Sequence, residues 1–463
     1  MKIKVLGAAQ TVTGSHHLLS IDGKNILVDF GLFQGKRSDT YEKNKKLLFD
    51  PSIIDAVLLT HAHIDHSGNI PNLVKNGFSK SIYATSATVD LCQIMLRDSA
   101  FLQEKDIEWL RKKKKKNNLE PLYTFEDVIN SLPHFVGVQY SKSVELFPNI
   151  TATFFDAGHI LGSAGILIEV KQDKKSIRIG FTGDIGRKDM PILNNPVILD
   201  DLDYLITETT YGNRLHSESE EVEEELASVI NSVYKRNGKI IIPAFAVGRT
   251  QLLVYILHKL FDQNRIPTMP IYVDSPLAVG ATSIFQSHPE CFDEETYSLF
   301  LDNFYDPFGF YRLKYIRNVE ESKRLNSINE PQIIISASGM AEGGRILHHL
   351  LNNISDPKNL ILFVGYAAGE TLARKIMDGN KFVKIFGEET EVKAEIKTMD
   401  YFSGHADKND LLEYVSYSRP EKLKKIFLVH GEEEQALPFR EELVKRGYRN
   451  IYYPESGEEI ELN

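Results

Sequence analysis

The chain has 463 residues, of which 42% are hydrophobic and 25% charged, and its formal net charge is -10 at pH 7. This is the composition of an ordinary soluble globular protein with two or three domains, and the negative charge argues against a protein that coats polyanions. The chain has only two cysteines, Cys92 and Cys291, far apart in the sequence, which argues against a disulfide scaffold and against a thiolate metal site. The sequence has no run of about eighteen apolar residues, which a membrane span would need. Met1–Gly7 predicts a first strand rather than a signal peptide, so we expect a cytoplasmic protein with no membrane partner.

The first 210 residues alternate short apolar runs with turns, a pattern that predicts strands of mixed sheets. The runs are Ile26–Val28, Val57–Leu59, Thr151–Phe155, Ile166–Val170, Ile177–Phe181 and Tyr204–Ile206. Between Ala87 and Lys116, apolar residues recur at helical spacing, which predicts one long or broken helix. Its end, Arg111–Lys116, is a block of basic residues that either is solvated or attracts phosphate.

Metal-type side chains follow several of these apolar runs directly. The densest group is the hexapeptide from His61 to His66, which has the pattern H-x-H-x-D-H and follows Ala56–Leu59. His159, Asp184 and His430 stand in the same context, each just after an apolar run. Imidazole nitrogen and carboxylate oxygen are ligands that zinc prefers, and two neighbouring zinc ions need about seven ligand positions with one bridging group. The residues therefore favour a binuclear centre, with a mononuclear site as the alternative.

After Tyr211 the pattern changes to strands that alternate with helices, which predicts a parallel sheet covered on both faces. The predicted helices are Ser219–Arg236 and Arg249–Leu260, and the predicted strands are Lys239–Ile242, Ile271–Val273, Ile333–Ser336, Leu360–Val364 and Val383–Phe386. Metal-type residues return at His405 and His430, so we expect the first domain to resume there. The expected division is 1–210, an insertion at 211–393, and a closing part of the first domain at 394–463.

Together these motifs resemble the metallo-β-lactamase superfamily. The H-x-H-x-D-H motif, His159, Asp184 and Asp29 within Leu27–Gly31 are similar to the motifs shared by that superfamily. Within it, the chain resembles the β-CASP group of RNA-processing nucleases, and it is most similar in outline to prokaryotic homologues of the endonuclease subunit of the cleavage and polyadenylation specificity factor. The resemblance implies an α/β fold, namely an αββα metallo-β-lactamase sandwich with an inserted β-CASP domain whose parallel sheet is flanked by helices.

The β-CASP resemblance rests on three motifs and on segments of the insert. Glu208 in Thr207–Gly212, His405 in Ser403–Asp407 and His430 in Val429–Glu432 are similar to the three motifs. The insert segments are Pro243–Arg249, Asp274–Ala278 and Ser336–Met340. Histidine at position 430 matches the members that act on RNA, whereas relatives that act on DNA usually carry valine there.

The resemblance also implies a role for each site residue. His61, His63, His159 and Asp184 would hold one zinc ion, and Asp65, His66, Asp184 and His430 the other, with manganese able to take the site in vitro. Asp184 would bridge the two ions, a hydroxide between them would attack phosphorus, and Asp29 would orient a ligand imidazole or the metal-bound water. His405 is expected to protonate the leaving oxygen while Glu208 holds its imidazole. The insert is expected to bind phosphate through Arg249, Ser336, Ser338, Gly339 and Arg345.

We therefore expect a zinc-dependent ribonuclease that hydrolyses single-stranded RNA. The residues do not decide between an endonuclease and a 5′-to-3′ exonuclease, and a homodimer is left open. Three alternatives remain at this point: a small-molecule hydrolase of the same fold, a DNA nuclease of the same family, and a non-catalytic partner of an active relative.

Overall fold

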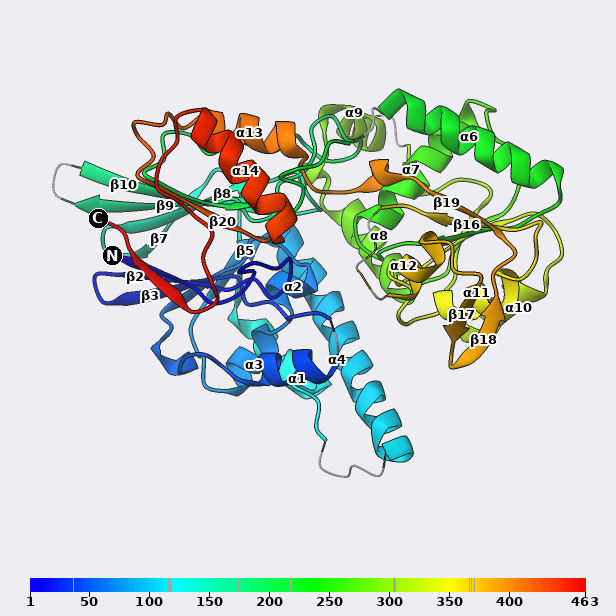
Figure 1. Ribbon diagram of the computed structural model, residues 1–463, viewed down its shortest axis with the longest axis horizontal. Coiled ribbons are helices and arrows are strands. Elements are labelled where there is room, and N and C mark those ends of the chain that lie inside the picture. The colour runs from blue at the N-terminus through cyan, green and yellow to red at the C-terminus, as the bar shows by residue number, and fades with distance from the viewer. Residues whose placement is uncertain are drawn as a thin grey trace. The chain divides into compact units, whose positions relative to one another are not determined.

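The computed structural model describes residues 1–35, 37–114, 119–172, 175–216, 219–302, 305–365, 367, 369 and 371–463. Two compact units make up the chain, residues 1–215 with 405–463, and residues 216–404 (Figure 1). The second unit is an insertion in the first. The expected insertion, 211–393, ends before strand β19 (Glu395–Thr398), which pairs with β16 (Leu360–Phe363) inside the inserted unit. β19 is half exposed and polar, so its sequence carries no apolar signal that would mark it as part of that sheet.

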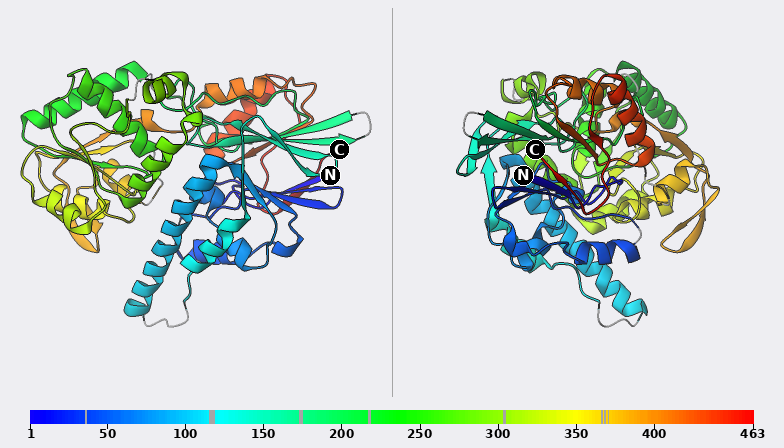
Figure 2. Two further views of the ribbon diagram at one scale, coloured as in Figure 1. Left: turned by 180° about the vertical axis from the view of Figure 1, so that it is seen from behind. Right: turned by 60° about the vertical axis from the view of Figure 1, so that its left-hand side comes forward.

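The first unit contains two seven-stranded sheets. One has the order β22 (Glu458–Glu461), β1 (Lys2–Val5), β2 (His17–Ile21), β3 (Lys24–Val28), β4 (Ala56–Leu58), β5 (Ile82–Thr85) and β6 (Phe135–Val138). The other has the order β21 (Ile451–Tyr452), β20 (Lys425–Val429), β11 (Tyr204–Glu208), β10 (Lys175–Phe181), β9 (Ala164–Gln172), β8 (Ile150–Asp156) and β7 (Ser143–Phe147). The last strand, β22, pairs with the first, β1, so the two chain ends lie on the same side of this unit (Figure 2).

A hydrophobic core joins the inner faces of these two sheets. Residues from both, among them Ile26, Phe154, Ile168, Phe181 and Phe427, are at most 2% exposed and pack in one cluster. Burial alternates along β2, as it does in strands with one face in a core. Because each such side chain contributes about 1.5–3 kcal/mol on burial, this cluster holds the sheets together.

Helices cover the outer face of each sheet. On the second sheet lie α13 (Lys408–Ser416) and α14 (Glu433–Lys445), whose buried Leu411 and Phe439 pack against Leu205 and Ile426 (Figure 1). The remaining helices of this unit are α1 (Arg37–Lys45), α2 (Ile64–Ser67), α3 (Ile70–Lys75), α4 (Ser86–Lys114) and α5 (Phe125–Ser131), and α4 contacts β5 and β6. The αββα sandwich and the long helix at 87–116 are thus confirmed, although Lys115 and Lys116 of the basic block lie outside the described residues.

The inserted unit is built on a six-stranded sheet in which all pairings are parallel. Its order is β14 (Leu313–Tyr315), β13 (Ile271–Val273), β15 (Ile333–Ser336), β12 (Ile240–Pro243), β16 and β19. The central strands β12, β15 and β16 are buried at every position, as is usual where helices cover both faces. The helices are α6 (Ser219–Lys235), α7 (Arg249–Asp262), α8 (Pro276–Ser287), α9 (Glu294–Tyr297), α10 (Val319–Ser327), α11 (Ile346–Asn353) and α12 (Leu372–Met377).

One predicted strand of the parallel sheet is placed elsewhere. The segment Val383–Phe386 was expected to continue that sheet, but it belongs to β17 (Phe382–Ile385), which pairs antiparallel with β18 (Glu388–Glu391) in a separate hairpin. The prediction of its partner was wrong because an apolar run indicates a strand without indicating which strand it joins.

No helix among the described ranges has a stretch long and apolar enough to cross a bilayer.

Candidate metal centre

The predicted ligands stand at strand ends of the first unit. Strands β10, β11 and β20 run parallel, and β8 shares their direction because β8 and β10 are each antiparallel to β9. Their carboxyl ends therefore meet at one edge of the sheet. His159 follows β8, Asp184 follows β10, and His430 follows β20. The other sheet supplies the hexapeptide, which runs from the end of β4 into α2.

Four side chains form the first ligand group, His61, His63, His159 and Asp184, whose ligand atoms lie within 4.8 Å of one another. His63 Nδ1 lies 3.1 Å from His61 Nε2 and 3.2 Å from His159 Nε2. Asp184 Oδ2 lies 3.5 Å from His61 Nε2 and 3.6 Å from His159 Nε2. Two ligands of a tetrahedral zinc ion at about 2.0–2.1 Å from the metal are about 3.3 Å apart. These four distances are close to those between the ligands of a tetrahedral zinc ion.

Asp65, His66 and His430 form the second group. His430 Nε2 lies 3.3 Å from His66 Nε2 and 3.5 Å from Asp65 Oδ2. The second oxygen of Asp184, Oδ1, lies 3.3 Å from His66 Nε2. That oxygen is buried, and no donor among the described residues is placed to form a hydrogen bond with it. Each Asp184 oxygen therefore faces one group, which is the arrangement of a bridging carboxylate.

Burial and charge favour a cation at this site. Burial lowers the pKa of His61 well below its usual value and that of His63 to about 4, so both rings are neutral and can act as ligands. Burial alone would raise the pKa of Asp184, but the charges of His430 and His66 outweigh it and hold that pKa well below its usual value. The neutral rings of His61 and His63 beside the ionised Asp184 suit a divalent cation, and the residues present therefore fit a pair of zinc ions.

Asp29 contacts the ring of His66. Its Oδ2 lies 2.7 Å from His66 Nδ1, while Thr60 donates to its Oδ1 from both the backbone nitrogen, at 2.8 Å, and the hydroxyl, at 3.0 Å. Burial lowers the pKa of His66, but Asp184 and Asp29 outweigh this effect and raise it well above its usual value. The ring lies between two carboxylates, and a cation on the Asp184 side would take the place of a proton there. When the Nδ1–H of His66 donates a hydrogen bond to Asp29, Nε2 is the nitrogen that faces the ligand group.

His405 and Glu208 lie beside the first ligand group. His405 Nδ1 is 3.2 Å from Glu208 Oε1 and 3.9 Å from Asp184 Oδ2, and its ring centroid is 4.5 Å from that of His159. The Glu208 carboxylate is 1% exposed and accepts from the backbone nitrogens of Ile185, at 2.6 Å, and Thr210, at 3.3 Å. Burial lowers the pKa of His405, but the charge and the hydrogen bond of Glu208 outweigh it and raise that pKa above its usual value.

The five expected phosphate contacts all belong to the inserted unit, and four of them have polar partners inside it. Ser336 donates its hydroxyl to the Asp274 carbonyl at 2.8 Å, and Arg345 forms an ion pair with Asp274 Oδ1 at 2.6 Å. Arg249 donates Nε to the Phe402 carbonyl at 3.1 Å. Ser338 Oγ contacts the Gly343 carbonyl at 3.4 Å, and a Cβ on Gly339 would lie 3.0 Å from the Phe245 ring. Phosphate binding by these residues stays a prediction.

Two threonines of the site were not predicted. Thr60 supports Asp29, and the Thr210 hydroxyl lies 3.0 Å from His430 Nδ1. Each of them stands within two residues of a predicted site residue, next to His61 and after Glu208. A threonine so near a predicted site residue is a usable sequence signal, because the second ring nitrogen of a ligand histidine generally donates a hydrogen bond to a neighbouring oxygen.

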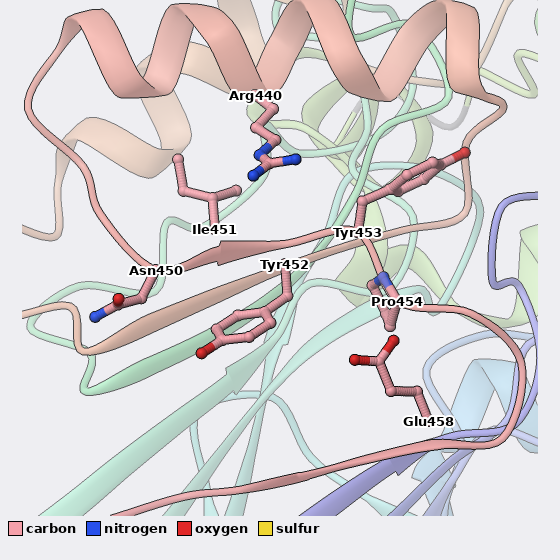
Figure 3. Close-up of a pocket in the computed structure, with 7 residues that line it drawn as sticks. All are labelled: Arg440, Asn450, Ile451, Tyr452, Tyr453, Pro454 and Glu458. Carbon is pink, nitrogen blue, oxygen red and sulfur yellow. The ribbon is translucent and has the colours of Figure 1, made fainter.

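A cavity of about 390 Å³ lies at the edge strand β21, apart from the ligand groups (Figure 3). It is lined by Arg440, Asn450, Ile451, Tyr452, Tyr453, Pro454 and Glu458. Arg440 reaches from α14 toward the strand on the same side as Tyr453, while Tyr452 points to the opposite side. The Tyr453 hydroxyl donates to the Gly431 carbonyl at 3.0 Å, so one wall of the cavity is tied to the residue that follows His430.

Asp156, at the end of β8, should make stability depend on pH. It is 8% exposed, and burial raises its pKa to about 7 although Gly158 and Asn194 donate to its oxygens. The folded chain keeps this proton up to about pH 7, whereas the unfolded chain loses it near pH 4, so the contribution of Asp156 to stability falls as pH rises between these values. We expect Asp156→Asn to raise the free energy of unfolding at pH 8 by about 1–4 kcal/mol, with a smaller difference at pH 4. Denaturant unfolding of the metal-free wild type and of the metal-free variant at pH 4 and pH 8 measures these differences. The same difference in the free energy of unfolding at both pH values would contradict the prediction.

Three family models match the chain. A metallo-beta-lactamase superfamily domain matches residues 18–182, a Beta-Casp domain residues 250–376, and a Zn-dependent metallo-hydrolase RNA specificity domain residues 389–454.

Similar proteins cover nearly the whole chain. Ribonuclease TTHA0252 of Thermus thermophilus is 36% identical over 96% of this chain and 97% of its own length. The transcription termination factor FttA of Pyrococcus abyssi is 33% identical over 94% of this chain and 67% of its own length. An RNase J-like protein of Methanocaldococcus jannaschii is 32% identical over 94% of both. A crystal structure of an Enterococcus faecalis protein of unknown function has a TM-score of 0.55 at 14% identity over 99% of both chains, which shows a shared fold.

Proposed function

Because the chain belongs to the β-CASP group of the metallo-β-lactamase superfamily, a group of metal-dependent hydrolases, we propose that it is a zinc-dependent ribonuclease acting on single-stranded RNA. The observation that carries the proposal is the placement of Asp184, whose two oxygens each face one group of histidines. The match to an RNA specificity domain and the relatives named as ribonucleases support RNA as the substrate.

In this proposal the two ligand groups would hold two zinc ions, and Asp184 would offer one oxygen to each group. His61, His63 and His159 would complete the first set, and Asp65, His66 and His430 the second. Bound zinc would supply Lewis acidity, which activates water at neutral pH and neutralises charge on the phosphate oxygens.

The protein's own residues would supply the proton for the leaving oxygen. His405 Nδ1 faces Glu208 at 3.2 Å, so Nε2 is the nitrogen that can give a proton to a substrate atom. Glu208 favours the protonated ring, and its own position is fixed by the backbone nitrogens of Ile185 and Thr210. This pair would act as a general acid whose orientation is set before the substrate arrives.

The proposal concerns a single chain, since the comparisons give no support to a homodimer. Cleavage of a single-stranded RNA labelled at the 5′ end and, separately, at the 3′ end tests the function, with a DNA of the same sequence beside it. We expect RNA cleavage that a zinc chelator stops and added zinc restores, with about two zinc ions per chain by elemental analysis. Internal fragments would indicate an endonuclease, and release of single nucleotides from the 5′ end an exonuclease.

Two results would overturn the proposal. A protein that holds two zinc ions but cleaves neither nucleic acid would be a small-molecule hydrolase or a non-catalytic partner. Faster cleavage of DNA than of RNA would make it a DNA nuclease of the same family.

A further inference from the structure

The segment that carries His430 is held by three side-chain hydroxyls, one on each of three consecutive carbonyls. Thr209 donates to the Val429 carbonyl at 3.1 Å, Thr210 to the His430 carbonyl at 3.0 Å, and Tyr453 to the Gly431 carbonyl at 3.0 Å. His430 itself has a φ of +49°, in the left-handed region that a residue with a side chain adopts only when its surroundings impose it. We call these three hydroxyls the hydroxyl clamp.

Thr210 differs from the other two because its oxygen also reaches the ring of His430. The Thr210 hydroxyl lies 3.0 Å from His430 Nδ1 as well as 3.0 Å from the His430 carbonyl. A threonine hydroxyl has one proton to donate and lone pairs to accept with, whereas a carbonyl can only accept. The hydroxyl proton is therefore used by the carbonyl, so the contact with the ring is satisfied when Nδ1 carries the proton; Nδ1 also lies 3.5 Å from Asp184 Oδ1, which likewise can only accept.

This assignment fixes the tautomer of His430. With the proton on Nδ1, the lone pair is on Nε2, the atom that lies 3.3 Å from His66 Nε2 and 3.5 Å from Asp65 Oδ2. Asp29 does the same for His66, whose Nδ1 it holds at 2.7 Å. The two histidines of the second ligand group thus each receive an oxygen partner that turns Nε2 toward the metal position.

We propose that Thr210 is a positioning residue that selects the metal-binding tautomer of His430 and thereby sets the affinity of the second metal position. The inference deepens the proposed function, since it concerns the same metal centre. The backbone nitrogen of Thr210 also donates to Glu208 Oε2 at 3.3 Å, so Thr210 supports both the second ligand group and the partner of His405.

Zinc binding in the absence of RNA tests this inference. Thr210→Val keeps the shape of the side chain and removes the hydroxyl, while Thr210→Ser keeps the hydroxyl. Competition with a chromogenic chelator should show the first zinc of Thr210→Val bound as in the wild type and the second bound about 10–100-fold more weakly. Thr210→Ser should bind both as the wild type does. Thr210→Ala, which needs less room, gives the same test if the valine variant does not fold.

Two further variants separate tautomer selection from general packing. Thr207→Val is the matched control, because Thr207 is a buried threonine of β11, three residues before Thr210, and its hydroxyl contacts the Glu208 carbonyl and not His430. Tyr453→Phe removes a clamp hydroxyl that touches only the backbone. We expect both to hold the second zinc within about threefold of the wild type, a smaller change than the loss of an outer partner of a ligand ring causes.

The outcomes distinguish this inference from the proposed function. Wild-type protein that binds fewer than two zinc ions would overturn the binuclear proposal itself. Two zinc ions bound equally by the wild type and Thr210→Val would overturn only the role of Thr210, as would a loss in Thr210→Ser as large as in Thr210→Val. A Tyr453→Phe variant as weak as Thr210→Val would assign the effect to the backbone position of His430 and not to its tautomer.

Discussion

Asp184→Asn should lose nearly all activity, with a rate at least about 10⁴-fold below that of the wild type, which corresponds to about 5 kcal/mol of transition-state stabilisation. The amide has nearly the same shape, but it carries no charge and presents an NH₂ group to one of the two ligand groups. Since each oxygen of Asp184 lies within 3.6 Å of histidine nitrogens of a different group, the substitution removes the oxygen that faces one group and the negative charge shared by both. We expect at most one tightly bound zinc ion per chain by elemental analysis, together with the loss of RNA cleavage.

The matched control for this variant is Asp203→Asn. Asp203 is a buried carboxylate of the same unit that accepts from the backbone nitrogen of Arg178 at 3.0 Å and stands outside both ligand groups. This variant should keep two zinc ions and wild-type cleavage. An Asp184→Asn protein that retained two zinc ions and most of its activity would show that the carboxylate does not bridge, and the centre would have to be assigned again.

Much of this centre could be predicted from the sequence because its ligands follow apolar strands. A short apolar run that ends in His, Asp or Gly indicates a strand end, and the ends of neighbouring parallel strands meet in space. His159, Asp184 and His430 are distant in the chain, yet the order β8, β9, β10, β11, β20 brings their strand ends to one edge. The resemblance of the motifs then supplied the pairing of ligands that periodicity could not.

Features that depend on contacts between distant segments could not be predicted. Arg345 follows two glycines near a strand, where an arginine often meets phosphate, but its partner Asp274 is 71 residues earlier and nothing local announces the pair. The same limit applies to β17, which is recognisable as an extended segment although packing decides which strand it pairs with, and to β19, whose polar sequence carries no apolar signal. The tautomer of His430 depends on a threonine 220 residues away in the chain.

His405→Ala should lower cleavage of RNA by about 10²–10⁴-fold, the range that a general acid contributes, while zinc content stays near two per chain. His405 contacts Glu208 at 3.2 Å but belongs to neither histidine group, and its nearest approach to Asp184 is 3.9 Å. Glu208→Gln should cause a smaller loss, because the amide can still hold the ring but no longer favours its protonated form. Single-turnover cleavage and elemental analysis of the purified variants measure both effects.

The leaving group decides whether the loss in His405→Ala is a loss of proton donation. In a nitrophenyl phosphodiester the leaving nitrophenolate departs without taking up a proton, whereas the leaving sugar oxygen of RNA needs one. If His405 is the acid, its removal should cost far less with the nitrophenyl ester than with RNA, and the double variant with Glu208→Gln should be no slower on RNA than His405→Ala alone, because the two residues act as one unit. Equal losses on the two substrates would mean that His405 positions the phosphate and does not protonate the leaving oxygen. A loss of zinc in the variant would instead assign His405 to the metal ligands, a role that its distance of 3.9 Å from Asp184 Oδ2 allows.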